Sequence, residues 1–185
     1  MLTVTPTAIE AVKIITPRAF ADSRGVFCET YNNSRFREHG ITLDFVQDNQ
    51  SRSIHAGTVR GLHFQSHPAA QDKLIRVLRG SIYDVAVDLR RSSPTYGKWV
   101  AETLTAEEGQ QLLVPVGFAH GFCTLEPDTR VLYKVTGYYS PANDLGVAWN
   151  DPDLGITWPV SQDKAILSDK DLGLPRFKSL PTYFE

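Results

Sequence analysis

The sequence predicts an all-β fold, an antiparallel sandwich or barrel made of two sheets. Short runs of β-branched, aromatic and apolar residues recur at regular intervals, and Gly, Pro or Asp turns separate them. The 185 residues and the hydrophobic content of 42% suit one domain with a sizeable core. No internal repeat or linker interrupts the series, so we expect residues 1–185 to form a single domain.

The first part of the chain, residues 1–30, is predicted to be an extended arm. A short strand is expected over 11–15 and an aromatic strand over 27–31, with a turn at Arg24-Gly25 between them. Spacing alone favours an ordinary exposed ion pair between Arg24 and Glu29. A phosphate clamp and a hydroxyl acceptor are the alternative roles for these two side chains.

A short helix and a polar stretch are expected after the arm. The helix is predicted over 34–39, capped by Asn33 or Ser34. Residues 45–53 are too polar for a core strand. Their amide side chains offer donors and acceptors that suit a pyrimidine or sugar edge, and a solvated loop fits the same residues equally well.

The remaining strands are predicted from seven runs, which are 59–65, 73–79, 82–89, 99–104, 110–114, 118–125 and 131–138. The runs 73–79 and 82–89 flank the turn Gly80-Ser81 and predict a β-hairpin. Alternation is lost after Pro141. A single helical turn capped by Ser168 is expected near the C-terminus, before Pro175.

Composition excludes several classes of partner. The formal net charge of −2 argues against a nucleic acid or an anionic membrane, so an anionic substrate must be held by locally placed cations. No apolar run is long enough to span a bilayer, and no leader segment is recognisable. Cys28 and Cys123 form no CxxC motif and lie in apolar runs. We therefore expect free, buried thiols in a reducing compartment and a cytoplasmic protein.

Two blocks of polar residues at strand positions predict a shared pocket. The blocks are Gly57-x5-His63-x-Gln65, followed by Lys73, and Gly109-x5-Pro115-x-Gly117-x2-His120. They resemble the paired motifs of the cupin superfamily, whose fold is a double Greek-key jelly roll. His63 and His120 stand in the first and last cupin metal positions. Gln65 and Lys73 stand where a second His and a Glu are expected, so the metal set is broken.

A base and a cation that face one pocket predict proton abstraction next to a carbonyl. A protonated lysine repels a divalent cation and has no lone pair to give, so we expect neither metal nor cofactor. Histidine has an unperturbed pKa of about 6.5, so His63 can accept a proton near neutrality. Lys73 can stabilise the enolate oxygen that forms. Alone, each residue would fit a core histidine or a snorkelling lysine; their spacing with His120 favours the site.

Three tyrosines lie in the last predicted strand or just beyond it: Tyr133, Tyr138 and Tyr139. Tyrosines in strands are usually half-buried packing residues. A phenol with a pKa of about 10 is also a competent proton donor for a carbanion. A second ring could stack on a nucleobase. The division of these roles among the three residues stays open.

Several separate blocks, in order from about Ile9 to about Pro175, resemble the dTDP-4-dehydrorhamnose 3,5-epimerase family. They are Arg24-Gly-x-Phe27-x-Glu29, Gln47-Asp48-Asn49, Arg60-Gly-Leu-His63-Phe-Gln65, Lys73, Pro115-x-Gly117-x-x-His120-Gly-Phe122, Leu132-Tyr133-Lys134, Tyr138-Tyr139 and Leu167-Ser-x-Lys170-Asp171. Departures are small: Gln50 stands where many members carry His, and the segment Asn143-Asp144 matches weakly.

The resemblance implies a metal-free enzyme that epimerises C3 and C5 of dTDP-4-dehydro-6-deoxy-D-glucose, giving dTDP-4-dehydro-L-rhamnose for dTDP-L-rhamnose biosynthesis. It implies that His63 is the proton acceptor, oriented by Asp171. It implies that Tyr133 is the donor on the opposite face and that Lys73 stabilises the enolate at O4. It also implies a homodimer in which the N-terminal arm completes the neighbour's site.

The same resemblance implies the substrate contacts. Arg24 and Arg60 match contacts to the diphosphate and sugar, and Tyr139 matches the ring that stacks on thymine. The other binding positions implied are Phe27, Glu29, Gln47, Asp48, Asn49, Lys73, His120, Asp144 and Lys170.

Other functions fit parts of the pattern. A monofunctional epimerase acting at C3 or C5 of a related dTDP-keto-deoxysugar would use the same proton-transfer residues. A non-catalytic sugar-nucleotide-binding cupin would be expected to lose His63 or Tyr133, and both are present. A metal-dependent cupin oxygenase is disfavoured by Gln65 and Lys73 at ligand positions.

Overall fold

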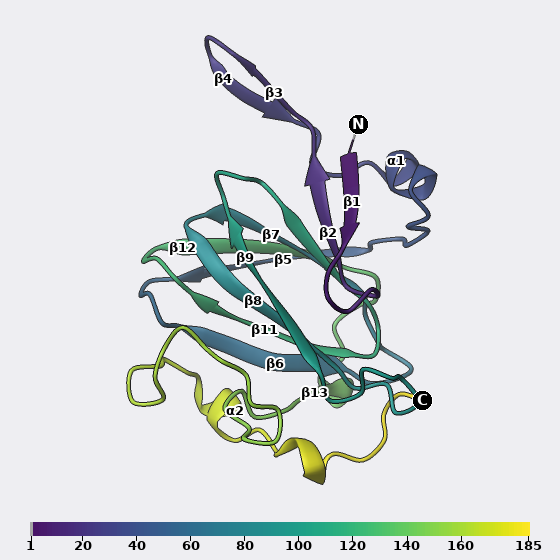
Figure 1. The fold of residues 1–185 in the computed structure, drawn as a ribbon, viewed down its shortest axis with the longest axis vertical. Coiled ribbons are helices and arrows are strands. Elements are labelled where there is room, and N and C mark those ends of the chain that lie inside the picture. The colour runs from purple at the N-terminus through teal and green to yellow at the C-terminus, as the bar shows by residue number, and fades with distance from the viewer. Residues whose placement is uncertain (1) are drawn as a thin grey trace.

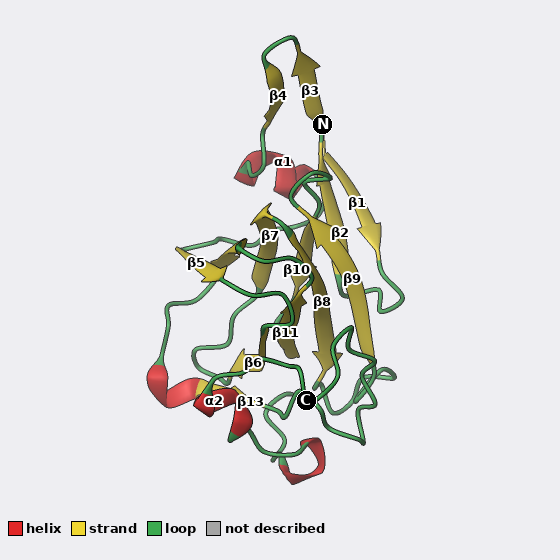
Figure 2. Cartoon of the chain, turned by 90° about the vertical axis from the view of Figure 1, so that its left-hand side faces the viewer, coloured by secondary structure: helices red, strands yellow, loops and turns green. Residues whose placement is uncertain are grey.

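Two antiparallel sheets face one another in a jelly roll with few, short helices (Figures 1 and 2). The structure, a computed structural model, describes residues 2–185; Met1, the first residue of the predicted arm, lies outside them. The predicted all-β, double-sheet fold is confirmed. No helix within the described residues is long and apolar enough to cross a bilayer.

The larger sheet has six strands in the order β1-β2-β10-β7-β12-β5. They are β1 (Leu2–Pro6), β2 (Lys13–Pro17), β5 (Gln47–Ser53), β7 (Lys73–Arg79), β10 (Gln111–Val114) and β12 (Thr129–Val135). The polar stretch 45–53 therefore contains an edge strand, and the alternative of a solvated loop is wrong. An edge strand tolerates polar residues because it has one neighbour and one open side.

The smaller sheet has five strands in the order β13-β6-β11-β8-β9. They are β6 (Val59–Gln65), β8 (Ser81–Asp88), β9 (Trp99–Thr105), β11 (Phe118–Thr124) and β13 (Asp144–Gly146). The predicted hairpin of 73–79 and 82–89 is wrong, because β7 and β8 belong to different sheets. The turn at Gly80, with φ of +77°, passes the chain from one sheet to the other. Val77 and Ile82 can then both be buried in one core cluster.

The main core lies between the two sheets. Alternate residues of β7, β8 and β12 point inward, among them Ile75, Ala86 and Val131, all almost fully buried. Each fully buried aliphatic side chain stabilises the fold by about 1.5–3 kcal/mol relative to an exposed one. The same inward rows carry the polar residues of the cavity described below.

Strands β6 and β11 approach unusually closely beside the two histidines. Gly61, with φ of +121°, lies against Gly121, and a Cβ built on Gly61 would come within 2.6 Å of the Gly121 Cα. The pairing of these strands sets His63 directly opposite His120. Only two glycines at this point allow that approach.

The N-terminal arm ends in a hairpin that projects from the body (Figure 1). Strands β3 (Ala19–Asp22) and β4 (Gly25–Cys28) pair only with each other among the described elements. Phe27 is 70% exposed and Val26 is 69% exposed. An isolated two-stranded hairpin is at best marginally stable, so this one is expected to pack on another surface.

The arm differs from its prediction in detail. The strand expected over 27–31 is β4 and ends at Cys28. The Cys28 thiol is only partly buried, so the expected burial is wrong there, whereas Cys123 is buried. Tyr31 instead packs edge-on against Phe36 and Phe45. Helix α1 (Asn33–Glu38) is capped by Asn32, whose side chain accepts the Arg35 N–H, so a cap at Asn33 or Ser34 is wrong by one or two residues.

The other helices are short. They are η1 (Pro141–Asn143), α2 (Asp169–Leu172) and η2 (Phe177–Ser179). Helix α2 begins as predicted, because the Ser168 side chain accepts the Asp171 N–H. This cap places Asp171, which is 5% exposed, under the smaller sheet.

Candidate active site

A cavity of about 200 Å³ lies between the sheets and brings most of the predicted residues together. The larger sheet contributes from β5, β7 and β12, and the smaller sheet from β6 and β11, while α2 closes one side. The lining residues are Ser51, Arg60, His63, Lys73, His120, Phe122, Tyr133, Ser168, Lys170 and Asp171.

His63 and Asp171 form a hydrogen-bonded pair. The distance between His63 Nε2 and Asp171 Oδ1 is 2.5 Å. Burial raises the pKa of the Asp171 carboxyl. The hydrogen bond from His63, the charge of His63 and the hydrogen bond from Ser168 lower this pKa by more, so it lies below its usual value. A carboxylate can only accept, so Nε2 carries the proton and the lone pair of neutral His63 lies on Nδ1. Asp171 thus fixes the orientation of the His63 ring, and the Nδ1 lone pair is the one that could accept a proton.

Tyr133 stands on the opposite wall from His63. It comes from β12 of the larger sheet, whereas His63 comes from β6 of the smaller one. Burial raises the pKa of the Tyr133 phenol, and the positive charge of Arg60 opposes this effect. The phenol therefore stays protonated at neutral pH. A base and an acid face one another across the cavity.

Lys73 is a partly buried cation in the same cavity. Its Nζ donates to the His63 carbonyl oxygen at 3.2 Å. Burial lowers the pKa of the Lys73 ammonium to about 8, against the attraction of Asp144 and Asp84. At neutral pH the side chain is still charged, because this pKa lies above 7.

His120 is held by an acid that the sequence prediction did not include. Its Nε2 lies 2.6 Å from Asp84 Oδ1, and both side chains are buried. Asp84 lies on β8 between the inward residues Ile82 and Ala86. An aspartate in such an apolar row is the signal that could have revealed it, because an unpaired carboxylate is costly to bury.

A second group of predicted residues lies at the rim of the cavity. Asp144 Oδ2 accepts from Lys170 Nζ at 2.5 Å and from the Tyr139 hydroxyl at 3.0 Å. Gln47 accepts the Tyr139 N–H and donates to Asn49. These contacts connect the edge strand β5, the loop after β12 and helix α2.

Asp48 does not reach the cavity. Successive strand residues point to opposite faces of a sheet, so Asp48 lies on the other face of β5 from Gln47 and Asn49. Its carboxylate binds Lys134 Nζ at 2.9 Å. The structure therefore pairs Asp48 with Lys134, and its role as a substrate contact stays a prediction.

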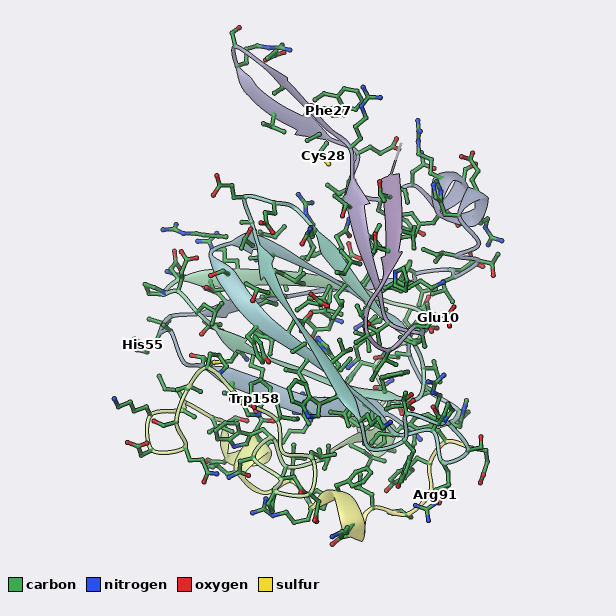
Figure 3. The ribbon with its side chains drawn as sticks, viewed as in Figure 1. Glu10, Phe27, Cys28, His55, Arg91 and Trp158 are labelled. Carbon is green, nitrogen blue, oxygen red and sulfur yellow. The ribbon has the colours of Figure 1, made fainter. Side chains whose placement is uncertain are left out.

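The three predicted binding residues of the arm also lie away from the cavity. Arg24 pairs with Asp22, and Glu29 pairs with Arg35, so the expected ion pair between Arg24 and Glu29 is absent from the described residues. Figure 3 shows Phe27 on the projecting hairpin, far from the C-terminal segment that carries α2. One chain alone does not assemble these residues with His63.

Gln65, in the second cupin ligand position, has a structural role. Its amide nitrogen donates to the carbonyls of Ala69 and Tyr138, and its oxygen accepts the Ser140 N–H. These bonds hold the loop that carries Tyr139. Within residues 2–185 there is no group of three His, Cys, Asp or Glu side chains arranged to hold a metal ion.

Sequence reasoning also missed three residues of the lining as site residues, which are Ser51, Phe122 and Ser168. Ser51 follows Gln47 and Asn49 by the two-residue period of β5, and that period could have been used to predict it.

A larger open hollow of about 800 Å³ lies elsewhere, beside Arg90 and Lys13, and no histidine or tyrosine lines it.

Comparison with known proteins agrees with this geometry. The family model for dTDP-4-dehydrorhamnose 3,5-epimerase matches residues 6–179. The dTDP-4-dehydrorhamnose 3,5-epimerase of Sinorhizobium fredii is 51% identical over 178 residues, which cover 96% of this chain and 91% of that protein.

Two solved structures are also similar. The Bacillus anthracis dTDP-4-dehydrorhamnose 3,5-epimerase, with TDP and PPi bound, has 54% identity and a TM-score of 0.93, covering 96% of this chain and all of that one. The Legionella pneumophila dTDP-6-deoxy-D-glucose-3,5-epimerase, in complex with dTDP-4-keto-L-rhamnose, has 42% identity and a TM-score of 0.93, covering 98% and 95%. The chain belongs to the dTDP-4-dehydrorhamnose 3,5-epimerase family.

Proposed function

We propose that the protein epimerises C3 and C5 of dTDP-4-dehydro-6-deoxy-D-glucose, giving dTDP-4-dehydro-L-rhamnose for dTDP-L-rhamnose biosynthesis. The observation that carries this proposal is a base and a proton donor on opposite walls of one cavity, with a cation between the sheets. Family membership supports the choice of substrate.

The reaction follows from the positions of three side chains. His63 takes the proton from the carbon next to the C4 ketone, and the electron pair of the broken C–H bond moves to O4 as an enolate. The Lys73 ammonium stabilises that charge. Tyr133 then gives its phenolic proton to the carbon from the other face, which inverts it. Solvent exchange returns the proton from His63 to Tyr133 before the second carbon reacts.

The cavity size indicates how the substrate lies. At about 200 Å³ it is smaller than a typical small-molecule pocket of ~300–1,000 Å³. It suits the sugar ring and leaves the nucleotide outside, along the rim. We place the diphosphate near Arg60 and Lys170 and the thymine against Tyr139, which is largely exposed.

The decisive experiment is turnover of the dTDP-keto sugar in D2O, followed by proton NMR. Exchange with inversion at both carbons supports the proposal. Exchange at C3 alone or at C5 alone would instead show the monofunctional alternative. Binding of dTDP without exchange at either carbon would show a non-catalytic binding protein.

We further propose a homodimer in which each arm, residues 1–30, completes the site of the other copy. The exposed, projecting hairpin β3–β4 supports this, because it carries Arg24 and Phe27 away from its own cavity. The cytoplasm is the proposed compartment, and the free thiols Cys28 and Cys123 are consistent with it.

Mixed dimers test the exchange of arms. We expect Arg24→Ala and His63→Ala to be weakly active or inactive as separate homodimers. A dimer that contains one copy of each should regain one intact site, because the intact arm meets the intact body. Activity of tagged, purified mixed dimers measures this. Mixed dimers no more active than the two parents would show that each arm serves its own subunit, and a fully active monomer would exclude the dimer.

Metal removal should leave activity unchanged. Lys73 occupies the position where a cupin carboxylate would bind a metal, and an ammonium in that position repels a divalent cation. Initial rates after exhaustive dialysis against a chelator should equal those of untreated enzyme. Loss of activity that one particular divalent cation restores would contradict the role given to Lys73.

Activity should fall as pH rises through about 8. The pKa of Lys73 is lowered to about 8 by burial, so its stabilising charge is present below this pH and is lost above it. The raised pKa of Tyr133 keeps the phenol protonated over the same range. A profile of kcat/KM from pH 6 to 10 measures this fall, because kcat/KM reports ionisations of the free enzyme. A kcat/KM that stays flat to pH 10 would show that the charge of Lys73 does not limit the reaction.

A further inference from the structure

The carboxylate of Asp84 is buried and only partly satisfied. Its side chain is 0% exposed, and Oδ1 accepts from His120 Nε2. Its other oxygen, Oδ2, is buried and has no hydrogen-bond partner within residues 2–185. A buried charge is costly unless nearby opposite charge compensates it. A cation close to this unsatisfied oxygen would compensate the charge of the carboxylate.

The cavity contains such a cation. Asp84 points inward from β8 of the smaller sheet, and Lys73 lies on β7 of the facing sheet. His120 lines the same cavity as Lys73. Asp84 lies behind His120 and is hydrogen-bonded to it, so its charge is one residue removed from the cavity wall. The opposite charges of Asp84 and Lys73 attract one another, and this attraction raises the pKa of Lys73. Burial has the larger effect and lowers that pKa.

The other charges around Lys73 come from several elements. Asp144 on β13 attracts it more strongly than Asp84 does, and Lys170 on α2 repels it. The remaining titratable side chains that line the cavity are Arg60, His63, His120, Tyr133 and Asp171. Asp144 also binds Lys170 and Tyr139 at the rim, and a bound nucleotide would compete for these groups. Asp84 is the attractive charge that stays fixed in the interior.

We propose that Asp84 is a positioning residue for the epimerisation, whose buried carboxylate orients His120 and supplies the fixed negative charge that keeps the Lys73 ammonium protonated inside the cavity. This rests on the proposed function for its catalytic meaning. The electrostatic part concerns the free protein and can be tested without substrate.

The test is a titration of Lys73 itself. Protein labelled with 13C at the lysine Cε is titrated by NMR, and the Lys73 signal is assigned by its absence in Lys73→Met. Asp84→Asn keeps the shape and a hydrogen-bonding oxygen while removing the charge. We expect the Lys73 midpoint to move to lower pH by roughly half a unit or more. The fall of kcat/KM at alkaline pH should move to lower pH with it, while dTDP affinity stays within a few-fold.

Two controls separate charge from structure. Asp88→Asn removes another fully buried carboxylate from the same strand, one that pairs with Arg90 outside the cavity. It should leave the Lys73 midpoint unchanged even if it lowers the melting temperature. His120→Gln keeps the Asp84 charge and an amide donor, so it should not lower the midpoint. Asp84→Ser provides a second neutral variant if the asparagine does not fold.

The proposal is overturned if both neutral Asp84 variants titrate Lys73 at the wild-type midpoint. It is equally overturned if Asp88→Asn or His120→Gln lowers the midpoint as much, because the effect would then follow disturbed packing. A shifted midpoint in a protein that shows no carbon exchange in D2O would support the electrostatic role and reject the proposed function.

Discussion

The His63→Ala variant is expected to lose both turnover and solvent exchange at C3 and C5. Removing a general base typically lowers the rate by about 10²–10⁴. Here no step can precede proton abstraction, so exchange should fall together with turnover. Deuterium incorporation, followed by NMR, and product formation are measured on the same sample.

Tyr133→Phe should fail in a different way. The phenol acts after the enolate has formed, so abstraction by His63 and return of deuterium to the original face remain available. Exchange without inversion is therefore expected, with little product. Loss of exchange in His63→Ala, together with exchange without inversion in Tyr133→Phe, would assign the base to the wall of His63 and the donor to the opposite wall.

His55→Ala is the matched control, because His55 is an exposed histidine on the body of the molecule (Figure 3). It should behave as wild type. A His63→Ala rate within a few-fold of wild type would exclude His63 as the base. Exchange lost equally in Tyr133→Phe would mean that the phenol takes part in abstraction.

Lys73→Met should depress kcat heavily and leave dTDP binding nearly unchanged. The C4 ketone is neutral in the ground state, and a full charge appears at O4 only when the proton leaves. Loss of one oxyanion donor in other enzymes costs about 10²–10³ in kcat, and loss of a cation should cost at least as much. Because dTDP lacks the ketone, its Kd reports the nucleotide contacts alone.

The same variant should be more stable than wild type at pH 7. Burial lowers the pKa of Lys73 from 10.5 to about 8, so the folded state holds the ammonium less favourably than the unfolded chain does. Methionine removes this penalty and keeps much of the stem volume. After allowance for partial exposure of the side chain, we expect a gain of about 1–3 kcal/mol in the free energy of unfolding.

The pH dependence of this gain follows from linkage. Between pH 8 and 10.5 the unfolded chain binds more protons at position 73 than the folded one, so wild-type stability rises with pH in that window. The difference in the free energy of unfolding between Lys73→Met and wild type should therefore become smaller as the pH rises from 8 to 10.5. Urea unfolding at pH 7 and pH 10 measures both values.

Lys164→Met, at an exposed lysine outside the cavity, is the control and should show neither effect. If dTDP binding weakens in Lys73→Met while kcat is preserved, Lys73 is a phosphate-binding residue. If the variant is less stable than wild type, the ammonium makes a net favourable contribution to the fold.

Local sequence patterns determined the strands and one helix cap. Alternation and turn residues are properties of a few neighbouring residues, so β6, β9 and β11 could be placed from them. Ser168 could be recognised as the cap of α2 for the same reason. The residue types His63, Lys73 and Tyr133 also indicated proton transfer, because their chemistry does not depend on the fold.

Features that depend on which strands become neighbours could not be read in this way. The turn at Gly80 looks like a hairpin turn, yet it carries the chain from one sheet to the other. Asp48 lies among binding residues in the sequence, but the pleat turns it toward Lys134. A local pattern gives the period of a strand and does not say which face meets the cavity.

The sequence alone determined the all-β class, and it indicated a broken cupin metal set and residue types suited to a base, a cation and a proton donor. Only the tertiary structure decided that His63 and Tyr133 stand on opposite walls of the cavity and that Asp84 forms a hydrogen bond with His120. It also decided that the N-terminal arm projects away from the cavity of its own chain. The physical reason is that these relations join residues from different sheets or from a projecting hairpin. Burial and charge compensation depend on contacts throughout the core. The residues next to each other in the sequence therefore do not reveal which distant residues will meet.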